Sequence, residues 1–327
     1  MVTGGAGFIG SHVVEDLLAA GHDIVVYDNF STGRHDNLKG VKGEVEVVVG
    51  DILDAEKLDR AMQRCDWVSH HAAQLEIFLS ISRPEDDLQQ NAIGTLNVLR
   101  AAKKAGAQKL VNVSSACVYG QSALASKEDM ACVPNWAYGV SKLAAEKYAQ
   151  IFNDYDGLPV ASLRYAIVYG EREWYRRVLP IFLKRVLLGQ PPVVFGDGSQ
   201  VRDFIHVADV VRLHRACFEQ PCAMGEIFNV SRGVATSIRE LASACCNIAE
   251  QPLQPLFEDT AEGDFSRLVP EKRRNAAELK QMLLDPGKAG ALLGWRPQVA
   301  LEDGLRREYL WAKDNLSRWD KVHYSVA

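Results

Sequence analysis

The sequence predicts a doubly wound α/β fold, a parallel sheet with helices on both of its faces. Up to about residue 170, short apolar runs alternate with segments of helical periodicity, which is the pattern of repeated strand–helix–strand units. A glycine-rich turn lies between a short apolar start and the first such helix. The 327 residues, 47% of them hydrophobic, suffice for one large α/β unit or two coupled domains.

The expected strands are five apolar runs, residues 23–28, 45–51, 67–73, 109–115 and 159–170. Amphipathic periodicity predicts the helices between them, residues 11–22, 55–65, 91–106 and 138–152. Only Met1 and Val2 precede Thr3 and the glycines, so we expect a further, very short strand at the start.

After about residue 170 the alternation weakens and prolines become common. We expect residues 1–165 to form a first domain, to which segments near 203–232 return. Residues 166–327 should form mainly a second, smaller α/β domain that closes a cleft against the first.

The composition narrows the class of protein. A formal net charge of −5 and a pI near 5.9 give no basic field for nucleic acid, and no apolar run is long enough to span a bilayer. The seven cysteines show no metal-binding spacing, and no signal peptide precedes the first motif. We therefore expect a cytoplasmic protein with reduced thiols and no metal.

The glycine-rich turn predicts a dinucleotide site. Gly4, Gly7 and Gly10 are spaced three residues apart, and Phe8 and Ile9 stand between the last two at the start of the helix. Glycine allows the tight turn, the close approach of a pyrophosphate and the packing of the helix on the sheet. The spacing indicates a Rossmann-type domain.

A carboxylate at the end of the next strand indicates NAD. Asp28 lies 18 residues beyond Gly10, where it can accept both ribose hydroxyls of the adenosine and would repel the 2'-phosphate of NADP. Arg34 is the one nearby cation that could favour NADP instead.

Other residues at strand ends are expected beside the cofactor, namely Asn29, Asp51, Ile52 and Ala72. Asp51 could face the adenine edge or equally cap the following helix. The histidines 70, 71 and 206 are expected to be structural.

The chemical groups follow two later strands and helices. The segment SSACVYG, residues 114–120, places two hydroxyls, a thiol and a phenol at the end of a strand. In YGVSK, Tyr138 and Lys142 share one helix face, and an ammonium a few ångströms away can lower the pKa of a tyrosine from about 10.

Motifs along nearly the whole chain resemble one family. These are TGGAGFIGSH, DNFSTGR, GDI, HHAAQ, NAIGTLNVLRAA, SSACVYG, YGVSK, RYAIVYG, FGDGSQVRDFIHVADVV and ALLGWRPQVALEDGL. The sequence is similar to the extended short-chain dehydrogenase/reductases, and within them to the nucleotide-sugar epimerases. DNFSTGR resembles the adenosine-binding turn of UDP-galactose 4-epimerases.

The resemblance implies an NAD-dependent enzyme with a nucleotide-sugar site, most simply for a UDP-sugar, in the C-terminal half. It implies a homodimer formed through the helices 91–104 and 138–152. It also implies the catalytic roles: Ser115 bridges the substrate and the tyrosine, Tyr138 is the acid/base, and Lys142 tunes Tyr138 and holds the nicotinamide ribose. Tyr119 would support the nicotinamide pocket.

On the substrate side, Arg202 is expected to contact the nucleotide or its diphosphate. Ile167 stands where relatives carry an asparagine for this diphosphate, so either Arg202, the basic run 272–274 or Arg267 takes over this contact, or the nucleotide sits differently. The polar segment 265–282 around this run is either a surface insertion or a basic lid. Glu76 is either a surface carboxylate or a sugar contact.

The implied reaction is transient oxidation of a sugar at C4 with return of the hydride to the opposite face. Sugar dehydratases of the family carry an Asp-Glu pair where this chain has Ala116 and Cys117, which disfavours dehydration. Cys117 matches the thiol of 3,5-epimerases and epimerase/reductases, and a thiol suits proton transfer beside a ketone. Such enzymes add a Lys or His where this chain has Arg172, Arg176 and Arg177.

Three alternatives to 4-epimerisation therefore remain open. They are a Cys117-assisted 3- or 5-epimerase with or without reduction, a simple NAD-dependent sugar oxidoreductase, and an NAD-bound regulatory protein without catalysis. The presence of Ser115, Tyr138 and Lys142 together argues against the last.

Overall fold

A computed structural model of the chain describes residues 1–41, 43–174, 177–249, 252–270, 272–274 and 278–319. Its largest element is a seven-stranded sheet in the order β11-β6-β5-β4-β1-β2-β3, in which every neighbouring pair is parallel. The strands are β1 (Val2–Thr3), β2 (Ile24–Asp28), β3 (Val45–Val49), β4 (Trp67–His70), β5 (Lys109–Ser115), β6 (Val160–Tyr165) and β11 (Ile227–Val230). The predicted fold class is confirmed.

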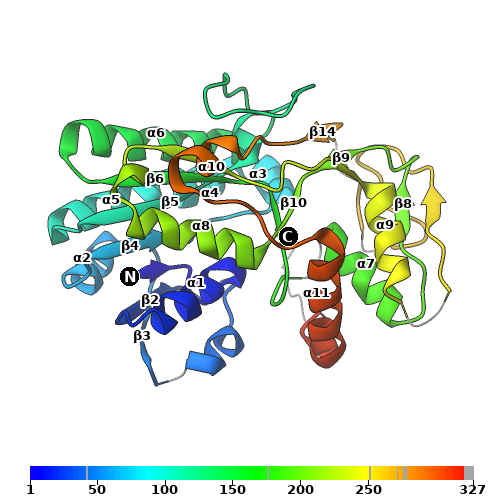
Figure 1. Cartoon of the computed structure of the whole chain (residues 1–327), viewed down its shortest axis with the longest axis horizontal. Helices are drawn as coiled ribbons and strands as arrows, with labels where there is room; N and C mark the ends of the chain where they lie inside the picture. The colour runs from blue at the N-terminus through cyan, green and yellow to red at the C-terminus, as the bar shows by residue number, and fades with distance from the viewer. Residues whose placement is uncertain (42, 175–176, 250–251, 271, 275–277, 320–327) are drawn as a thin grey trace.

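Helices cover both faces of this sheet (Figure 1). On one face α1 (Phe8–Ala19) packs against α8 (Val207–Glu219). On the other face α5 (Gly94–Ala105) packs between α2 (Ala55–Met62) and α6 (Ala137–Asp156). The short helices α3 (Ile77–Ser82) and α4 (Pro84–Leu88) and a π-helical turn (Gln89–Ile93) lead into α5.

The central strand β1 has two residues, as the short apolar start predicts. It lies between β2 and β4. From β1 the chain first forms one side of the sheet with β2 and β3, and it then crosses over to form the other side, beginning with β4 and β5. A crevice forms outside the carboxyl ends of the strands at such a reversal of strand order. The glycine-rich turn follows β1 at this point.

The apolar run 159–170 is two strands and not one as predicted. β6 ends at Tyr165, and β7 (Ile167–Tyr169) pairs with β10 (Phe204–His206) in a separate two-stranded sheet. The change occurs within two residues, because the Ala166 N–H donates to Val230 O at 3.0 Å and the Ile167 N–H to Asp203 O at 2.9 Å. Both acceptors, Val230 and Asp203, are distant in sequence from the run 159–170.

The C-terminal half has its own apolar core. Its helices are α7 (Val178–Leu187), α9 (Ile238–Asn247) and α11 (Leu301–Asn315), and its strands are β8 (Val193–Phe195), β9 (Val201–Arg202), β12 (Thr236–Ser237), β13 (Leu256–Glu258) and β14 (Gln281–Met282). Helix α10 (Gly287–Leu293) instead packs on β11 and α8. Helices α7, α9 and α11 lie together at the right of Figure 1, away from the large sheet. Because α8 and β11 return to that sheet, we propose the predicted division near residue 165, with segments near 203–232 belonging to the first domain.

The contact between α11 and β7 depends on a glycine. A Cβ atom on Gly304 would lie 2.2 Å from the hydroxyl oxygen of Tyr169, whose side chain is fully buried. We expect Gly304→Ala to lower the free energy of unfolding by about 1–3 kcal/mol, because overpacking moves either the ring or the helix. Chemical denaturation measures this.

Gly290, inside α10, is the matched control. Its Cβ would meet only ordinary contact, 3.4 Å from Trp295 O, so Gly290→Ala should be neutral or slightly stabilising. Equal destabilisation by both substitutions would contradict a steric role for Gly304.

Candidate active site

A cavity of about 620 Å³ opens where the large sheet meets the C-terminal half. The first domain contributes the glycine-rich turn and the ends of β2, β4 and β5, and the C-terminal half contributes residues from α7, β9, α11 and the segment that follows α11. The cavity is large enough for a dinucleotide or nucleotide-sized ligand.

The glycine-rich turn fits a pyrophosphate. Gly4 has φ +66°, and a Cβ on it would lie 2.7 Å from Ala72 N. A Cβ on Gly10 would lie 2.2 Å from Gly4 O, so α1 can approach the turn only with glycine there. Gly7 precedes α1 and places no capping side chain over the first N–H groups of the helix. The Gly7 N–H donates to Gly4 O at 3.0 Å, and the first helical residues, Phe8 and Ile9, line the cavity, where a helix N-terminus attracts phosphate.

Asp28 lies at the end of β2, on the cavity wall, as predicted. Its carboxylate accepts from the Ala6 N–H at 2.9 Å and the Phe30 N–H at 2.8 Å, and burial raises its pKa. Phe30 has φ 56°, and a Cβ on Gly33 would lie 2.7 Å from Asp28 Oδ1. The turn after β2 thus wraps the carboxylate closely while leaving it on the cavity wall for a ribose.

Of the remaining residues expected at the cofactor, Asn29, Ile52 and Ala72 line the cavity. Asp51 does not; its carboxylate accepts from Asn29 Nδ2 at 2.8 Å and so supports a lining residue. The alternative that Asp51 caps the next helix is wrong, because Asp54 is the N-cap of α2 and accepts from the Lys57 N–H at 3.0 Å.

The three predicted catalytic residues lie on one wall of the cavity. Ser115 ends β5, Tyr138 lies in the first turn of α6, and Lys142 follows one turn later. Ser115 lies close enough to Tyr138 to oppose the rise of the Tyr138 pKa, and the Ser115 Oγ accepts from the Cys117 N–H at 3.2 Å.

Burial controls the charge of this wall. It raises the pKa of Tyr138, and the nearby Cys117 raises it further. It lowers the pKa of Lys142 to about 8, against the opposing effect of Asp87 and Glu146. Bound NAD⁺ supplies a hydride acceptor and a positive charge, and positive charge beside a phenol lowers the pKa of the phenol.

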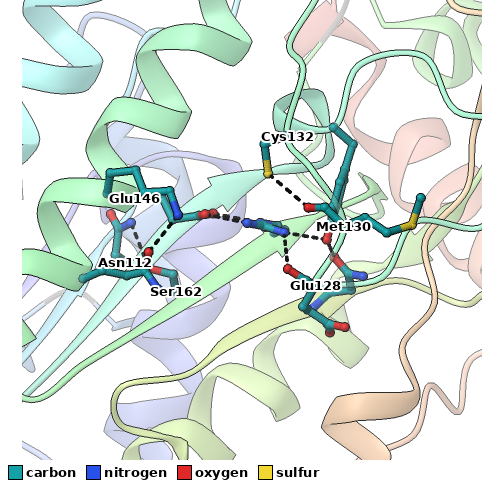
Figure 2. Close-up of polar contacts among 11 residues, drawn as sticks. Asn112, Glu128, Met130, Cys132, Glu146 and Ser162 are labelled. Atoms are coloured by element: carbon teal, nitrogen blue, oxygen red, sulfur yellow. Dashed lines mark hydrogen bonds and ion pairs between the residues drawn. The ribbon is translucent and has the colours of Figure 1, made fainter. Parts of the chain in front are cut away.

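A buried ion pair fixes the rotation of α6 about its axis. Glu146 lies one turn beyond Lys142, and its carboxylate accepts two hydrogen bonds from Arg164 of β6, at 2.6 and 2.9 Å (Figure 2). Both side chains are at most 2% exposed. Since β6 pairs with β5, this bidentate contact ties the helix of Tyr138 to the strand of Ser115.

The other side of Arg164 holds the loop after β5. Its guanidinium donates to Glu128 O at 3.2 Å and to the hydroxyl of Tyr119 at 2.7 Å. In Figure 2 the Glu146 carboxylate and the chain around Glu128 lie on opposite sides of this network. Tyr119 is expected beside the nicotinamide, but it does not line the cavity. Its side chain lies in the network around Arg164, where its hydroxyl donates to Asn229 Oδ1 at 2.8 Å.

Cys117 lines the cavity beside Ser115. Burial raises the pKa of the thiol, and Arg177 and Arg202 oppose this shift. Arg172 and Arg177, after β7, also line the cavity, while Arg176 lies outside the described residues.

Arg202 faces the cavity from β9, as expected for a diphosphate contact. It donates to Val201 O and Leu279 O, both at 2.8 Å, and lies 3.7 Å from Glu278. The structure does not bring Arg267 to the cavity: its side chain is 83% exposed and pairs with Glu258 at 3.4 Å.

The other residues considered for the substrate side are the basic run 272–274, Ile167 and Glu76. Lys272 and Arg273 line the cavity, while Arg274 pairs with Glu278. Ile167 and Glu76 also line it, so Glu76 is not a plain surface carboxylate.

The three histidines have different environments. His70 bonds to Thr3 Oγ1 at 2.7 Å and Thr95 Oγ1 at 2.9 Å, and His206 accepts from the Ala208 N–H and caps α8. His71 bonds to Ser69 Oγ at 2.9 Å and also lines the cavity, so all three histidines have protein partners, as expected of structural residues. In the described part of the chain, no group of three or more His, Cys, Asp or Glu side chains is placed to hold a metal ion.

The sequence-based prediction missed the residues that the last helix brings to the cavity. Trp311 lies on α11, and Arg318 and Trp319 follow it. They lie in no motif and far from the other lining residues in sequence. Among the described residues, no helix is both long and apolar enough to cross a bilayer.

The family model of the NAD-dependent epimerase/dehydratase family matches residues 1–231. The chain belongs to this family. Among its relatives, the UDP-glucose 4-epimerase of Mycolicibacterium smegmatis is 36% identical over 94% of this chain and 96% of its own length.

Solved structures of the family superpose closely on this chain. The UDP-glucose 4-epimerase of Thermotoga maritima, with UDP-glucose, has a TM-score of 0.87 at 33% identity over 96% of this chain and 98% of that one. The UDP-glucose 4-epimerase of Thermus thermophilus, with NAD, has a TM-score of 0.84 at 34% identity over 95% and 97%. The predicted family, its NAD cofactor and the class of enzyme, an NAD-dependent epimerase, are confirmed.

Tyr138 can be tested without removing any other contact of the wall. We expect Tyr138→Phe to lower kcat by about 10²–10⁴-fold, the usual contribution of a general acid/base, while NAD remains bound. Turnover assays and the absorbance of released cofactor measure the two effects. Tyr155→Phe, 85% exposed at the end of the same helix, should leave turnover unchanged.

The Glu146–Arg164 pair makes a second prediction. Glu146→Gln leaves a buried guanidinium unpaired, which should cost about 3–5 kcal/mol of stability. It also removes a charge that raises the pKa of Lys142, so the activity limb due to loss of the Lys142 proton should move to lower pH. Denaturation and a pH–rate profile measure these changes.

The double substitution Glu146→Met with Arg164→Met separates the two effects. An apolar pair of similar volume should recover most of the stability, yet the pH shift should persist because the carboxylate is still missing. A pH profile restored to that of the wild type would contradict electrostatic tuning by Glu146.

Proposed function

We propose that the protein is an NAD-dependent nucleotide-sugar 4-epimerase of the UDP-glucose/UDP-galactose type. The observation that carries the proposal is the placement of Ser115, Tyr138 and Lys142 on the wall of the cavity that also holds the glycine-rich turn and Arg202. The names of the most similar relatives, UDP-glucose 4-epimerases, support the choice of substrate.

NAD supplies the acceptor and donor of the hydride. Gly7, Phe8 and Ile9 hold its pyrophosphate, Asp28 its adenosine ribose and Lys142 its nicotinamide ribose. These residues fit the cofactor because the glycine positions have no space for a Cβ and the helix N–H groups are uncapped.

The side chains of the wall move one proton. Ser115 orients the C4 hydroxyl of the sugar toward Tyr138, which takes the proton as the hydroxyl becomes a ketone. The ammonium of Lys142 stabilises the phenolate, and Tyr138 returns the proton when the ketone is reduced from its other face. Arg202 anchors the diphosphate while the sugar turns over, so no net redox change results.

Two features disfavour the alternatives. Ala116, beside Ser115, cannot carry the proton that a dehydratase must transfer. Burial raises the pKa of the Cys117 thiol, and this chain has Arg172 and Arg177 where a thiol-assisted epimerase adds a Lys or His as the acid. A non-catalytic role would not require the three groups to meet on one wall.

The deciding test is proton NMR of the enzyme with UDP-, dTDP-, GDP- and CDP-sugars in heavy water. We expect inversion at C4 of a UDP-sugar without deuterium in the ring, because the hydride returns internally. Cys117→Ala should retain turnover within a few-fold. Deuterium at C3 or C5, lost in Cys117→Ala, would replace our proposal with a thiol-assisted epimerase.

We also propose the predicted homodimer, formed through α6 and the helix 91–104, with the segment that precedes this helix contributing to the interface. Exposed apolar side chains gather there, Val140, Tyr148 and Ile151 on α6 and Leu88 and Ile93 beside it. An exposed set of this kind is typical of an interface. The reducing cytoplasm remains the expected compartment.

Sedimentation tests the dimer. Val140→Glu with Ile151→Glu should give a monomer, because the carboxylates would be buried without partners. Leu310→Glu, exposed on α11, is the control and should sediment as the wild type does. An unchanged dimer in the α6 variant would place the interface elsewhere.

A further inference from the structure

The segment that follows α11 returns to the cofactor end of the cavity. It forms a short helical turn, Leu316–Trp319, and both Arg318 and Trp319 line the cavity. The Trp319 indole donates to Glu173 O at 3.0 Å and is 2% exposed. The end of the described chain is thus anchored to the segment after β7 and, through Lys184, to α7.

Arg318 is linked to the glycine-rich turn through one side chain. Its guanidinium donates to Asn37 Oδ1, and Asn37 Nδ2 donates to Ala6 O at 2.8 Å. Asn37 is buried and lines the cavity, so Arg318 reaches a fixed part of the nucleotide site across 281 positions of sequence.

Two further arginines lie close to Arg318 on the same cavity wall. Arg34 follows the turn around Asp28, and Arg172 donates to Ser11 Oγ at 3.1 Å and Glu15 Oε1 at 2.5 Å on α1. Burial lowers the pKa of Arg318, and the charges of Arg34 and Arg172 lower it further, while the charge of Asp36 opposes this shift.

The acids around the three guanidinium groups leave an excess of positive charge. Asp36 is shared between Lys39, 2.7 Å away, and Arg34, 3.8 Å away, and Glu15 pairs with Arg172, so these two carboxylates face four cations when Arg318 is included. Asp28 is held by its two backbone N–H groups. Like charges brought together in a half-buried place are unfavourable unless an anion joins them.

We propose that Arg318, together with Arg34 and Arg172, binds the pyrophosphate of NAD, and that the segment Leu316–Trp319 thereby retains the cofactor. The pyrophosphate is the anion that fits, because the N-terminus of α1 lies on this wall and Arg172 bonds to its first turns. A guanidinium suits it, since its fork of donors matches a phosphate bidentately.

The proposal concerns retention of NAD and requires no sugar, so it can be tested apart from the proposed reaction. Holoenzyme is mixed with an excess of fluorescent etheno-NAD, and the exchange rate is followed at low and at physiological ionic strength. For Arg318→Ala we expect exchange about tenfold faster than in the wild type, as for loss of a charged hydrogen bond, and a weaker dependence on salt.

Two variants control for charge and for folding. Arg318→Lys keeps the charge without the fork and should fall between the wild type and Arg318→Ala. Arg307→Ala, on the exposed side of α11, should exchange as the wild type does. Wild-type exchange in Arg318→Ala would overturn the proposal.

Competition by fragments separates a phosphate contact from mere packing. Arg318→Ala should weaken the binding of ADP about tenfold and leave that of adenosine unchanged. Equal weakening of both would mean that the segment only packs over the site. A greater loss for 2'-AMP than for ADP would mean that the arginines hold a 2'-phosphate, and either result would overturn the assignment to the pyrophosphate.

Discussion

The close approach of the glycine-rich turn to β4 and α1 is the constraint on which the rest of the structure depends. Gly4 meets the backbone at Ala72, and Gly10 meets Gly4 O, with no space for a side chain at either. The two-residue strand β1 therefore passes directly into a helix at the centre of the sheet, and the uncapped end of that helix opens on the cavity. Asp28 is fixed by the same turn through the Ala6 N–H.

The reacting groups are positioned by a second constraint, which acts from behind the wall. Tyr138, Lys142 and Glu146 are spaced four residues apart on α6, so the bidentate contact of Glu146 with Arg164 sets the direction of the other two. The same guanidinium holds Tyr119 and the loop at Glu128. One buried cation thus joins the catalytic helix, the strand of Ser115 and the loop between them.

The predicted site residues that the structure brings to the cavity are those whose geometry is encoded locally. The glycine spacing, the carboxylate of Asp28 and the four-residue spacing of Tyr138 and Lys142 each determine a geometry within a few residues. The direction of a side chain is not encoded in this way. Arg267 and Tyr119 have suitable chemistry, yet one pairs with Glu258 at the surface and the other turns to Arg164.

Partners that are distant in sequence account for the other differences. The run 159–170 reads as one strand, and only the positions of Val230 and Asp203 show that it changes sheet at Ala166. The tryptophans 311 and 319 and Arg318 carry no motif, because their role depends on where α11 docks.

The two ends of the cavity have different tasks, since the sugar turns over at one end and the cofactor is retained at the other. The C-terminal segment contributes to the cofactor end. The sugar must rotate between two hydride transfers, so its end cannot hold the ligand tightly along its whole length. The cofactor must be reoxidised in place, so its end gains from slow release. At the cofactor end the arginines 34, 172 and 318, from three separate segments, line the cavity. At the sugar end Arg202 lies 3.7 Å from Glu278. The arginines of the cofactor end retain NAD between the two hydride transfers, as a cycle without net redox change requires.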